Sequence, residues 1–203
     1  MAIISNAVTI ADAGAFSVNL GSMVHIKTLT ASSSSTLSFV HGTADVVLDS
    51  TYPIYKFEFI NIHPATNNGI FSFQGSTDGG SNYNITMTTT WFYAGLSEGG
   101  GGAYLVYGTA ADQAQGTGFQ RLSAGIHNDN DNNLNGELSI YNPSSTTFVK
   151  HFMSRNATKG DEGNDCYIAG YFNTTSALNA FQFKFNSGNI DAGKIKLYGI
   201  KDS

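Results

Sequence analysis

The 203-residue sequence contains little cysteine, proline and charge. It has one cysteine and three prolines, and charged residues make up 12% of the chain, which is about half the usual share for a soluble domain. Cys166 has no second cysteine to pair with, so an internal disulfide is excluded and synthesis in a reducing compartment is expected. Because 41% of the residues are hydrophobic, a chain of this length can bury a core without such a crosslink.

Basic residues are also scarce. The chain has ten Lys and Arg residues against 15 Asp and Glu residues, for a formal net charge of -5. The basic residues stand singly, so no basic stripe follows a phosphate backbone, and nucleic acid is not an expected partner. No apolar run approaches the length that crosses a bilayer, and the first residues lack a basic leader followed by an apolar segment. We therefore expect synthesis and folding in the cytosol, without membrane insertion.

Helical spacing is absent over any stretch longer than about two turns, whereas alternation of apolar and polar residues is widespread. Alternation with a period of two is typical of strands that place apolar side chains on one face and polar ones on the other. The clearest alternating stretches are residues 24–27, 37–39, 55–59, 83–87 and 181–185. Less regular runs cover residues 3–10, 70–73, 91–94, 104–107, 138–141, 148–153 and 167–172.

Turn-forming clusters separate these stretches at intervals of roughly ten residues. The clusters are rich in Gly, Asn, Asp and Ser. They lie at residues 32–36, 67–69, 78–82, 98–102, 128–133 and 159–164. This spacing predicts an all-β fold, an antiparallel β-sandwich with jelly-roll-like connections. Residues 112–119 are the one stretch that suits a short helix or an irregular excursion.

We expect two parts in the chain, an extended N-terminal arm over residues 1–20 and a single β-sandwich domain over residues 21–203. The boundary is placed there because the first strong alternation begins only at Val24. The glycine-rich residues 97–102 are too few for a linker between domains, so we interpret them as a flexible loop within one domain. An arm of this kind commonly packs on a neighbouring subunit.

The last residues of the chain combine a turn and a strand. Residues 187–189 suit a reversal, and Ile195 and Leu197 alternate with Lys194 and Lys196, so the two pairs face opposite ways. We expect this strand to form a hairpin-like pair with the preceding alternating stretch and to close the sandwich core.

One loop has part of the pattern of a calcium site. Residues 127–133 read HNDNDNN and place Asp129, Asp131 and Asn133 at alternate positions. Leu134 stands where the sharp-turn glycine of a calcium-binding loop belongs, and Ile140 where its bidentate Glu belongs. We therefore interpret the segment as a solvated loop, with calcium binding as the alternative.

No complete catalytic constellation is evident. The histidines are scattered and lack the close spacing of a zinc site, and nothing favours a glycosidase pair among the Glu residues. No Gly-x-Ser-x-Gly elbow and no phosphate-binding loop occurs. We therefore assign no catalytic, cofactor-binding or metal-binding residue and expect neither an enzyme nor a cofactor. The residues weighed for these roles are His25, His41, His63, His127, His151, Glu58, Glu98, Glu137 and Glu162.

Five aromatic residues cluster in predicted strands, namely Trp91, Phe92, Tyr93, Tyr104 and Tyr107. Ring stacking is the usual way in which a β-sandwich holds a carbohydrate, so these residues could line a sugar-binding face. Aromatic residues in strands belong more often to the core, which is the interpretation that we favour.

Three long segments resemble a known group of proteins. They read VVLDSTYPIYKFEFINIHPATNNGIFSFQ at residues 46–74, NPSSTTFVKHF at residues 142–152 and YIAGYFNTTSALNAFQFKFNSGNIDAGKIKLYGIK at residues 167–201. The sequences of these segments resemble those of small β-sandwich virion proteins of tailed bacteriophages, many of them from aquatic environments. The resemblance covers most of the chain but contains no catalytic motif and carries over no functional residue. It implies a non-enzymatic β-sandwich in the virion, in a group whose members are often trimers.

The resemblance and the composition together predict a structural component of a tailed-phage virion, in the tail, baseplate or fibre region or on the head as a decoration protein. We expect it to assemble through its arm and the sides of its sandwich with copies of itself, as a homotrimer, and with other virion proteins. The alternative is a host-recognition module whose loops at residues 97–102 and 128–133 touch a cell-surface glycan. A third hypothesis is a polysaccharide-degrading enzyme that depends on Glu137 or Asp131.

Overall fold

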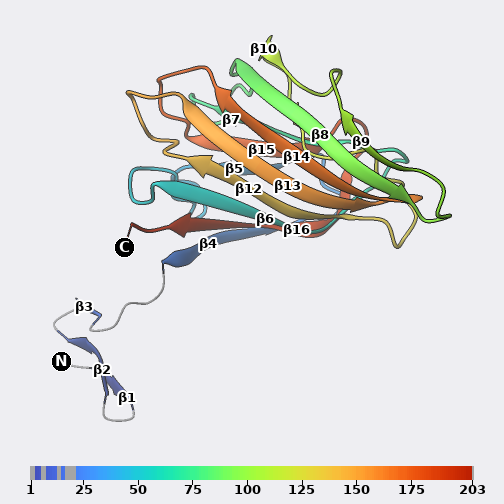
Figure 1. Cartoon of the computed structure of the whole chain (residues 1–203). Helices are drawn as coiled ribbons and strands as arrows, with labels where there is room; N and C mark the ends of the chain where they lie inside the picture. Colours follow the sequence, from blue (N-terminus) through green and yellow to red (C-terminus); the bar gives the residue numbers. More distant parts are fainter. Residues whose placement is uncertain (1–2, 6–7, 13–14, 17–21, 203) are drawn as a thin grey trace.

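The computed structural model describes residues 3–5, 8–12, 15–16 and 22–202. Over these residues the chain is all-β and has no helix, and so none that could span a bilayer. Two antiparallel sheets pack face to face, which confirms the predicted β-sandwich (Figure 1). The jelly-roll-like connections stay a prediction.

The larger sheet has nine strands in the order β10-β8-β14-β13-β12-β6-β16-β4, with β9 beside β8. Consecutive strands β12, β13 and β14 pair as antiparallel neighbours, and β14 then pairs along its whole length with β8. The strands are β4 (Met23–Thr30), β6 (Ile54–Pro64), β8 (Met87–Ser97), β9 (Ala103–Tyr107), β10 (Ala114–Gly116), β12 (Leu134–Tyr141), β13 (Lys150–Lys159), β14 (Glu162–Phe172) and β16 (Ile190–Ile200).

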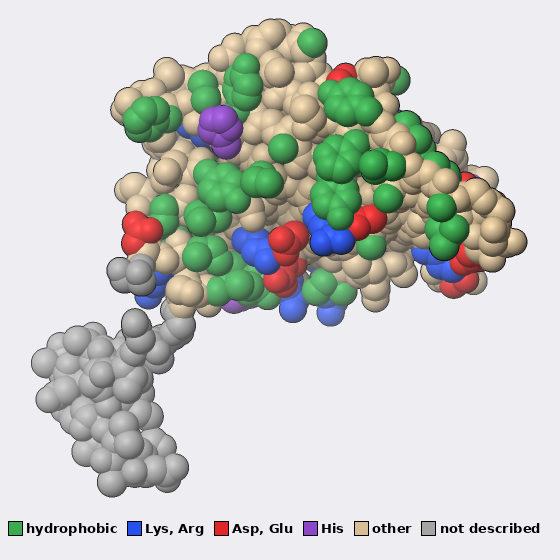
Figure 2. Space-filling view, in the orientation of Figure 1, with side chains coloured by type: hydrophobic (Ala, Val, Ile, Leu, Met, Phe, Trp, Pro, Cys, Tyr) green, Lys and Arg blue, Asp and Glu red, His purple; other side chains and the backbone are tan. Residues whose placement is uncertain are grey.

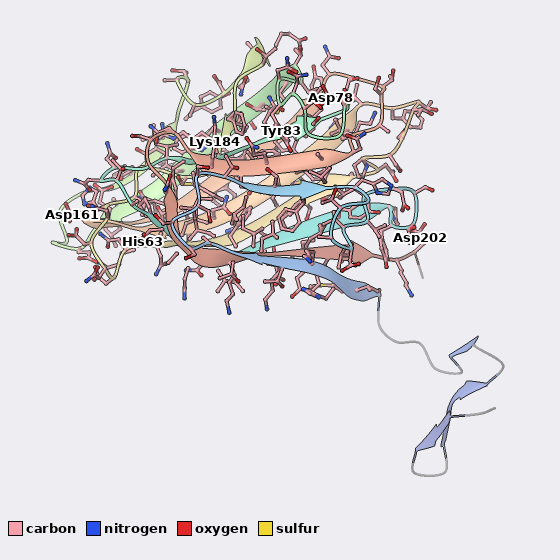
Figure 3. All side chains as sticks on the ribbon, turned by 180° about the vertical axis from the view of Figure 1, so that it is seen from behind. His63, Asp78, Tyr83, Asp161, Lys184 and Asp202 are labelled. Carbon is pink, nitrogen blue, oxygen red and sulfur yellow. The ribbon has the colours of Figure 1, made fainter. Side chains whose placement is uncertain are left out.

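The smaller sheet has four strands in the order β11-β7-β15-β5. It covers the inner face of the larger sheet, as the ribbon shows from both sides (Figures 1 and 3). Its strands are β5 (Leu37–Val40), β7 (Phe71–Ser76), β11 (Gln120–Arg121) and β15 (Ala180–Phe185).

Phenylalanine rings fill the space between the sheets. Phe57 of the larger sheet meets Phe183 of the smaller one with ring centroids 5.1 Å apart, and Phe73 meets Phe152 at 5.0 Å. All four rings are buried and stand at steep angles to one another, as quadrupole interactions favour. Each buried ring contributes about 1.5–3 kcal/mol relative to exposure, so the core can do without a disulfide.

The structure confirms most of the predicted strands, but it corrects the stretch at residues 83–87. Residues 82–86 form no strand, and β8 begins at Met87. The segment runs along the smaller sheet, where the carbonyl of Ile85 accepts a hydrogen bond from Gln74 Nε2 at 3.1 Å. Tyr83, which Figure 3 shows near Asp78, and Ile85 are both partly buried. Apolar residues at alternate positions here anchor a loop, a role that periodicity cannot distinguish from a strand. Residues 112–119 form no helix and contain β10 in an otherwise irregular path.

The expected pairing of the last two strands is wrong. β15 lies in the smaller sheet and β16 in the larger one, so residues 186–189 carry the chain across the sandwich and do not close a hairpin. Gly188 adopts a positive φ of 71° in this crossing. Phe183 and Leu197 still point into one core from opposite sides. The alternating pattern therefore specified which residues face inward but not which strands pair.

The predicted arm lies partly outside the described residues. Three short strands are described in it, β1 (Ile3–Ser5), β2 (Val8–Asp12) and β3 (Ala15–Phe16), which form an antiparallel sheet in the order β1-β2-β3. Among the described residues these strands pair only with one another. Residues 1–2, 6–7, 13–14 and 17–20 of the arm fall outside the described parts, and the division at residue 20 stays a prediction.

Candidate functional site

We call the face of the nine-stranded sheet that points away from the smaller sheet the outer face (Figure 2). Strand alternation decides which side chains reach it. In β8, Trp91 points inward and is 2% exposed, whereas its neighbour Phe92 points outward and is 37% exposed. Met153 of β13, 57% exposed, lies on the same face.

Strand register aligns seven outward side chains in a single row across this face. The members sit opposite one another on β9, β8, β14, β13, β12, β6 and β16, so the row crosses most of the sheet. We call this the cross-sheet row. In order it comprises Tyr107, Phe92, Tyr167, Arg155, Glu137, Glu58 and Lys196.

The first half of the row is a stack of rings capped by a cation. The rings of Phe92 and Tyr167 lie 5.0 Å apart and within 3° of parallel. On β13, the strand on the other side of Tyr167, Arg155 places its guanidinium carbon 5.0 Å from the centre of the Tyr167 ring. Both faces of the Tyr167 ring are therefore occupied, and Phe92, at the end of the stack, is 37% exposed.

Asp165 holds this stack together through hydrogen bonds. Arg155 donates from Nη2 and Nε to the Asp165 carboxylate, at 2.7 and 3.1 Å, and the Tyr167 hydroxyl donates to the same group at 2.9 Å. The Arg155 guanidinium lowers the pKa of the Asp165 carboxyl, and the bond to Asp165 raises the pKa of the Tyr167 hydroxyl. Each charged group in the stack is thus already paired.

The second half of the row is charged. Glu137 lies directly opposite Glu58 in the register of β12 and β6, and Lys56 Nζ forms an ion pair with Glu137 at 2.6 Å. A shallow hollow of about 620 Å³ lies over this region, lined in part by both Glu residues, Asn135 and Arg155. The sequence did not predict that Glu58 and Glu137 would meet.

Two neighbouring carboxylates could in principle serve as an acid and a base. The Glu137 side chain is 50% exposed and ion-paired, and the hollow lies on an open sheet surface. A catalytic carboxylic acid needs a setting that raises its pKa and keeps it protonated, such as an apolar pocket. The outer face instead offers donors and acceptors for a bound partner.

The predicted aromatic cluster is divided between the two sides of the sheet edge. Trp91 belongs to the core, as expected, whereas Phe92 and Tyr107 lie on the outer face. Tyr93 and Tyr104 lie on the inner side with ring centroids 5.5 Å apart. The hydroxyl of Tyr104 donates to Glu162, and burial raises its pKa well above the ordinary value. Glu162, one of the Glu residues considered for catalysis, is therefore the acceptor of a hydrogen bond from Tyr104.

The polar side chains of the loop at residues 127–133 contact one another and Lys159, the last residue of β13. Asp131 accepts an ion pair from Lys159 Nζ at 3.0 Å, and Asn132 Oδ1 accepts from the same ammonium at 3.0 Å. Asp129 accepts from Asn132 Nδ2 at 3.3 Å. The lysine ammonium therefore supplies the positive charge among these oxygens. Within residues 22–202, no group of three or more His, Cys, Asp or Glu side chains could hold a metal ion.

The histidines are dispersed, as the sequence indicated. His63 Nδ1 lies 3.7 Å from Asp191, and His127 Nδ1 lies 3.8 Å from Asp161. His63 comes from β6 and Asp191 from β16, whereas His127 and Asp161 lie in loops, and the two pairs share no residue. The structure thus gathers none of the histidines around a catalytic centre in its described part.

Sequence reasoning missed the residues that complete the cross-sheet row, above all Arg155, Asp165 and Tyr167. Outward alternation could have placed each of them on the polar face of a strand. Their meeting depends on the register of three strands, which a single sequence does not give.

Comparison with known proteins found no matching family model, no matching curated protein and no matching solved structure.

Proposed function

We propose that this protein is a non-enzymatic structural component of a tailed-phage virion that assembles with copies of itself and with other virion proteins. The resemblance of residues 46–74, 142–152 and 167–201 to virion proteins is consistent with a position in the tail, the baseplate, the fibre or the head. The arm at residues 1–20 and the sides of the sandwich are its proposed contact surfaces, and the trimer expected from the resemblance is one form of that assembly.

The observation that carries the proposal is the exposure of large apolar side chains on the sandwich. They gather on β8 and β9 and include Leu96 and Leu105, with Phe148 exposed before β13. Figure 2 shows apolar groups spread over the open outer face, interrupted by a few charges. Large apolar side chains left exposed in this way are typical of proteins that bury them against a partner.

The paired state of the charges supports a binding role over catalysis. Arg155 is bonded to Asp165, Lys56 to Glu137 and Lys159 to Asp131. Charges that are already paired can enter an interface without leaving an uncompensated ion. The groups that would serve a hydrolase are therefore used to hold the sheet surface in one arrangement.

Deletion of residues 1–20 from the phage gene tests the proposal. We expect the truncated protein to fold but to be lost from purified particles, as measured by quantitative mass spectrometry of virions. A matched control replaces the same residues by a Gly/Ser-rich segment of equal length, which should also fail to be incorporated. Normal incorporation of either variant would contradict assembly through the arm, and absence of the full-length protein from particles would contradict the virion proposal itself.

Recognition of a host-surface glycan is the second candidate function, and one observation favours it. Phe92 is partly exposed at the end of the stack, and Tyr107, which is also exposed, lies directly opposite it on β9. Beyond the stack, Glu137 and Asn135 present acceptors and donors that suit sugar hydroxyls.

A glycan array with the purified protein tests this second function. We expect binding to be lost in Phe92→Ala and kept in Met153→Ala, since Met153 lies on the same face but carries no ring. Equal binding by wild type and both variants would place the glycan elsewhere, and no binding by the wild type would leave assembly as the proposed role.

A further inference from the structure

Strand β9 is an edge of the nine-stranded sheet. Its register pairs it with β8 from Ala103 to Tyr107, and among the described residues no other strand pairs with it. The edge is also unusually exposed, with Leu105 73%, Tyr107 52% and Val106 38% accessible.

The direction of the backbone groups of β9 follows from one hydrogen bond. Gly108 donates its N–H to the Trp91 carbonyl at 3.0 Å, next to the opposed pair Tyr107 and Phe92. Hydrogen-bonded pairs alternate with non-bonded ones in an antiparallel ladder. Tyr104 and Val106 therefore direct their backbone groups toward β8. Ala103, Leu105 and Tyr107 direct theirs away from the sheet, ready to pair with another strand.

Nothing in β9 protects this edge. Natural sheets guard edge strands with lysine, proline, bulges or a covering loop. The sequence of β9, AYLVY, has no charge and no proline, and its register with β8 is regular. Residues 99–102, which precede it, are all glycine and present no side chain that would obstruct an approaching backbone. An edge of this kind is suited to the addition of a strand.

We propose that the added strand is β9 of a second copy of this chain, paired antiparallel about a two-fold axis through Leu105. The two larger sheets then continue into each other, joined by about six backbone hydrogen bonds. The inference rests on the proposed function, because it names a surface through which copies of the protein assemble, and this two-fold pairing gives a dimer in place of the trimer that the resemblance implies.

The side chains of β9 complement themselves in this register. Leu105 meets its own counterpart on the outer face, where Tyr107 lies opposite the small Ala103 of the other copy. On the inner side Tyr104 lies opposite Val106, an aromatic and β-branched pair of the kind that stabilises antiparallel strands. A two-fold axis brings two identical strands together, so a strand with a net charge would repel its copy, and β9 has no charged residue.

Other edges of the sandwich suit this pairing less well. β4, at the opposite edge, carries His25 and Lys27, and its register with β16 is broken by a bulge. β10 has only three residues. Among the edges of the larger sheet, β9 is therefore the strand whose pairing with itself leaves no mismatched charge and uses all five of its residues.

Charge-swap variants of Leu105 test the two-fold pairing. Sedimentation velocity of the full-length protein over a concentration series should show a dimer for the wild type. Leu105→Glu alone and Leu105→Lys alone should each sediment as monomers, with dissociation constants raised at least about tenfold by self-repulsion. An equimolar mixture of the two should restore the dimer, because Glu then faces Lys. High salt should weaken the mixed dimer and leave the wild-type dimer unchanged.

Met153→Glu is the matched control, since it adds the same charge to an exposed apolar position on the outer face away from β9. It should dimerise as the wild type does, and circular dichroism should show all variants folded. A monomeric wild type, an oligomer of any size that survives Leu105→Glu, or a mixture no larger than its components would overturn the inference. These measurements use purified protein, so their failure is distinguishable from failure of incorporation into particles.

Discussion

Lys150 is the residue whose surroundings least suit its chemistry. It is fully buried at the start of β13, and Nζ donates one hydrogen bond, to the carbonyl of Thr174 at 3.1 Å. No carboxylate forms an ion pair with it among the described residues, and burial lowers the pKa of its ammonium group. A buried cation with a single neutral partner destabilises the fold.

Lys150→Met should therefore make the protein more stable, by about 1 kcal/mol at pH 7. Because the pKa is lower in the folded state than in the unfolded chain, the wild type gains stability as pH rises from the folded value toward about 10.4. The advantage of the variant should shrink over that range. Urea denaturation at a series of pH values measures this, and Lys194→Met, at an exposed position, should show neither effect.

A wild type that is more stable than Lys150→Met at pH 7 would mean that Lys150 has a favourable partner. A difference that does not change with pH would mean that the ammonium is ordinarily solvated in the folded protein.

Leu197, in contrast to Lys150, is an apolar side chain in a buried apolar site. It is completely buried on β16, where it lies between Phe57 of β6 and Lys27 of β4 in register. Leu197→Asp should abolish folding, since an unpaired buried carboxylate costs at least about 4 kcal/mol. Lys194→Asp, exposed on the same strand, should change stability by less than about 0.5 kcal/mol. Thermal unfolding followed by circular dichroism distinguishes them, and wild-type stability in Leu197→Asp would contradict the placement of the strand.

At the scale of elements, one buried side chain fixes two irregular segments onto the smaller sheet. Gln74 of β7 donates from Nε2 to the carbonyls of Ile85, Thr117 and Gly118, at 3.1, 3.2 and 2.9 Å. Its Oε1 accepts from the Gly75 N–H at 2.8 Å. Residues 82–86, which the sequence assigned to a strand, thus form no ladder, and Gln74 holds them together with residues 117–118, which follow the short pairing of β10 with β8.

Gln74→Leu should release both segments. The substitution keeps the volume but leaves three carbonyls without this donor, which should cost about 2 kcal/mol. Hydrogen exchange should quicken at residues 82–86 and 117–118 and stay unchanged in β13. Gln182, directly opposite Gln74 on β15, donates only to Ser38 Oγ at 3.0 Å, so Gln182→Leu should cost less than about 1 kcal/mol. Equal exchange in the two variants would contradict this role of Gln74.

At the scale of the whole molecule, sequence periodicity was sufficient for the fold class and insufficient for the site. Alternation placed Leu197 and Phe183 in the core, because inward-facing residues follow a period of two in any sandwich. It could not separate pairing within a sheet from packing between sheets, which is why the predicted pairing of β15 with β16 is wrong. Prediction of the cross-sheet row would have required the register of seven strands. Of its three aromatic residues, the sequence pattern singles out Phe92 and Tyr107 but not Tyr167.

The arm is the part of the molecule that the sandwich should be able to lose. Strands β1, β2 and β3 pair among themselves, and the buried core of the described residues begins at Ala31. Removing residues 1–20 should therefore leave the free energy of unfolding within about 0.5 kcal/mol of the full-length value, a shift of about 2 °C at most. Calorimetry of both proteins at equal concentration measures the shift. A drop of many degrees would mean that the arm packs on the sandwich of its own chain, and an arm so engaged would not be available to bind a neighbour in the particle.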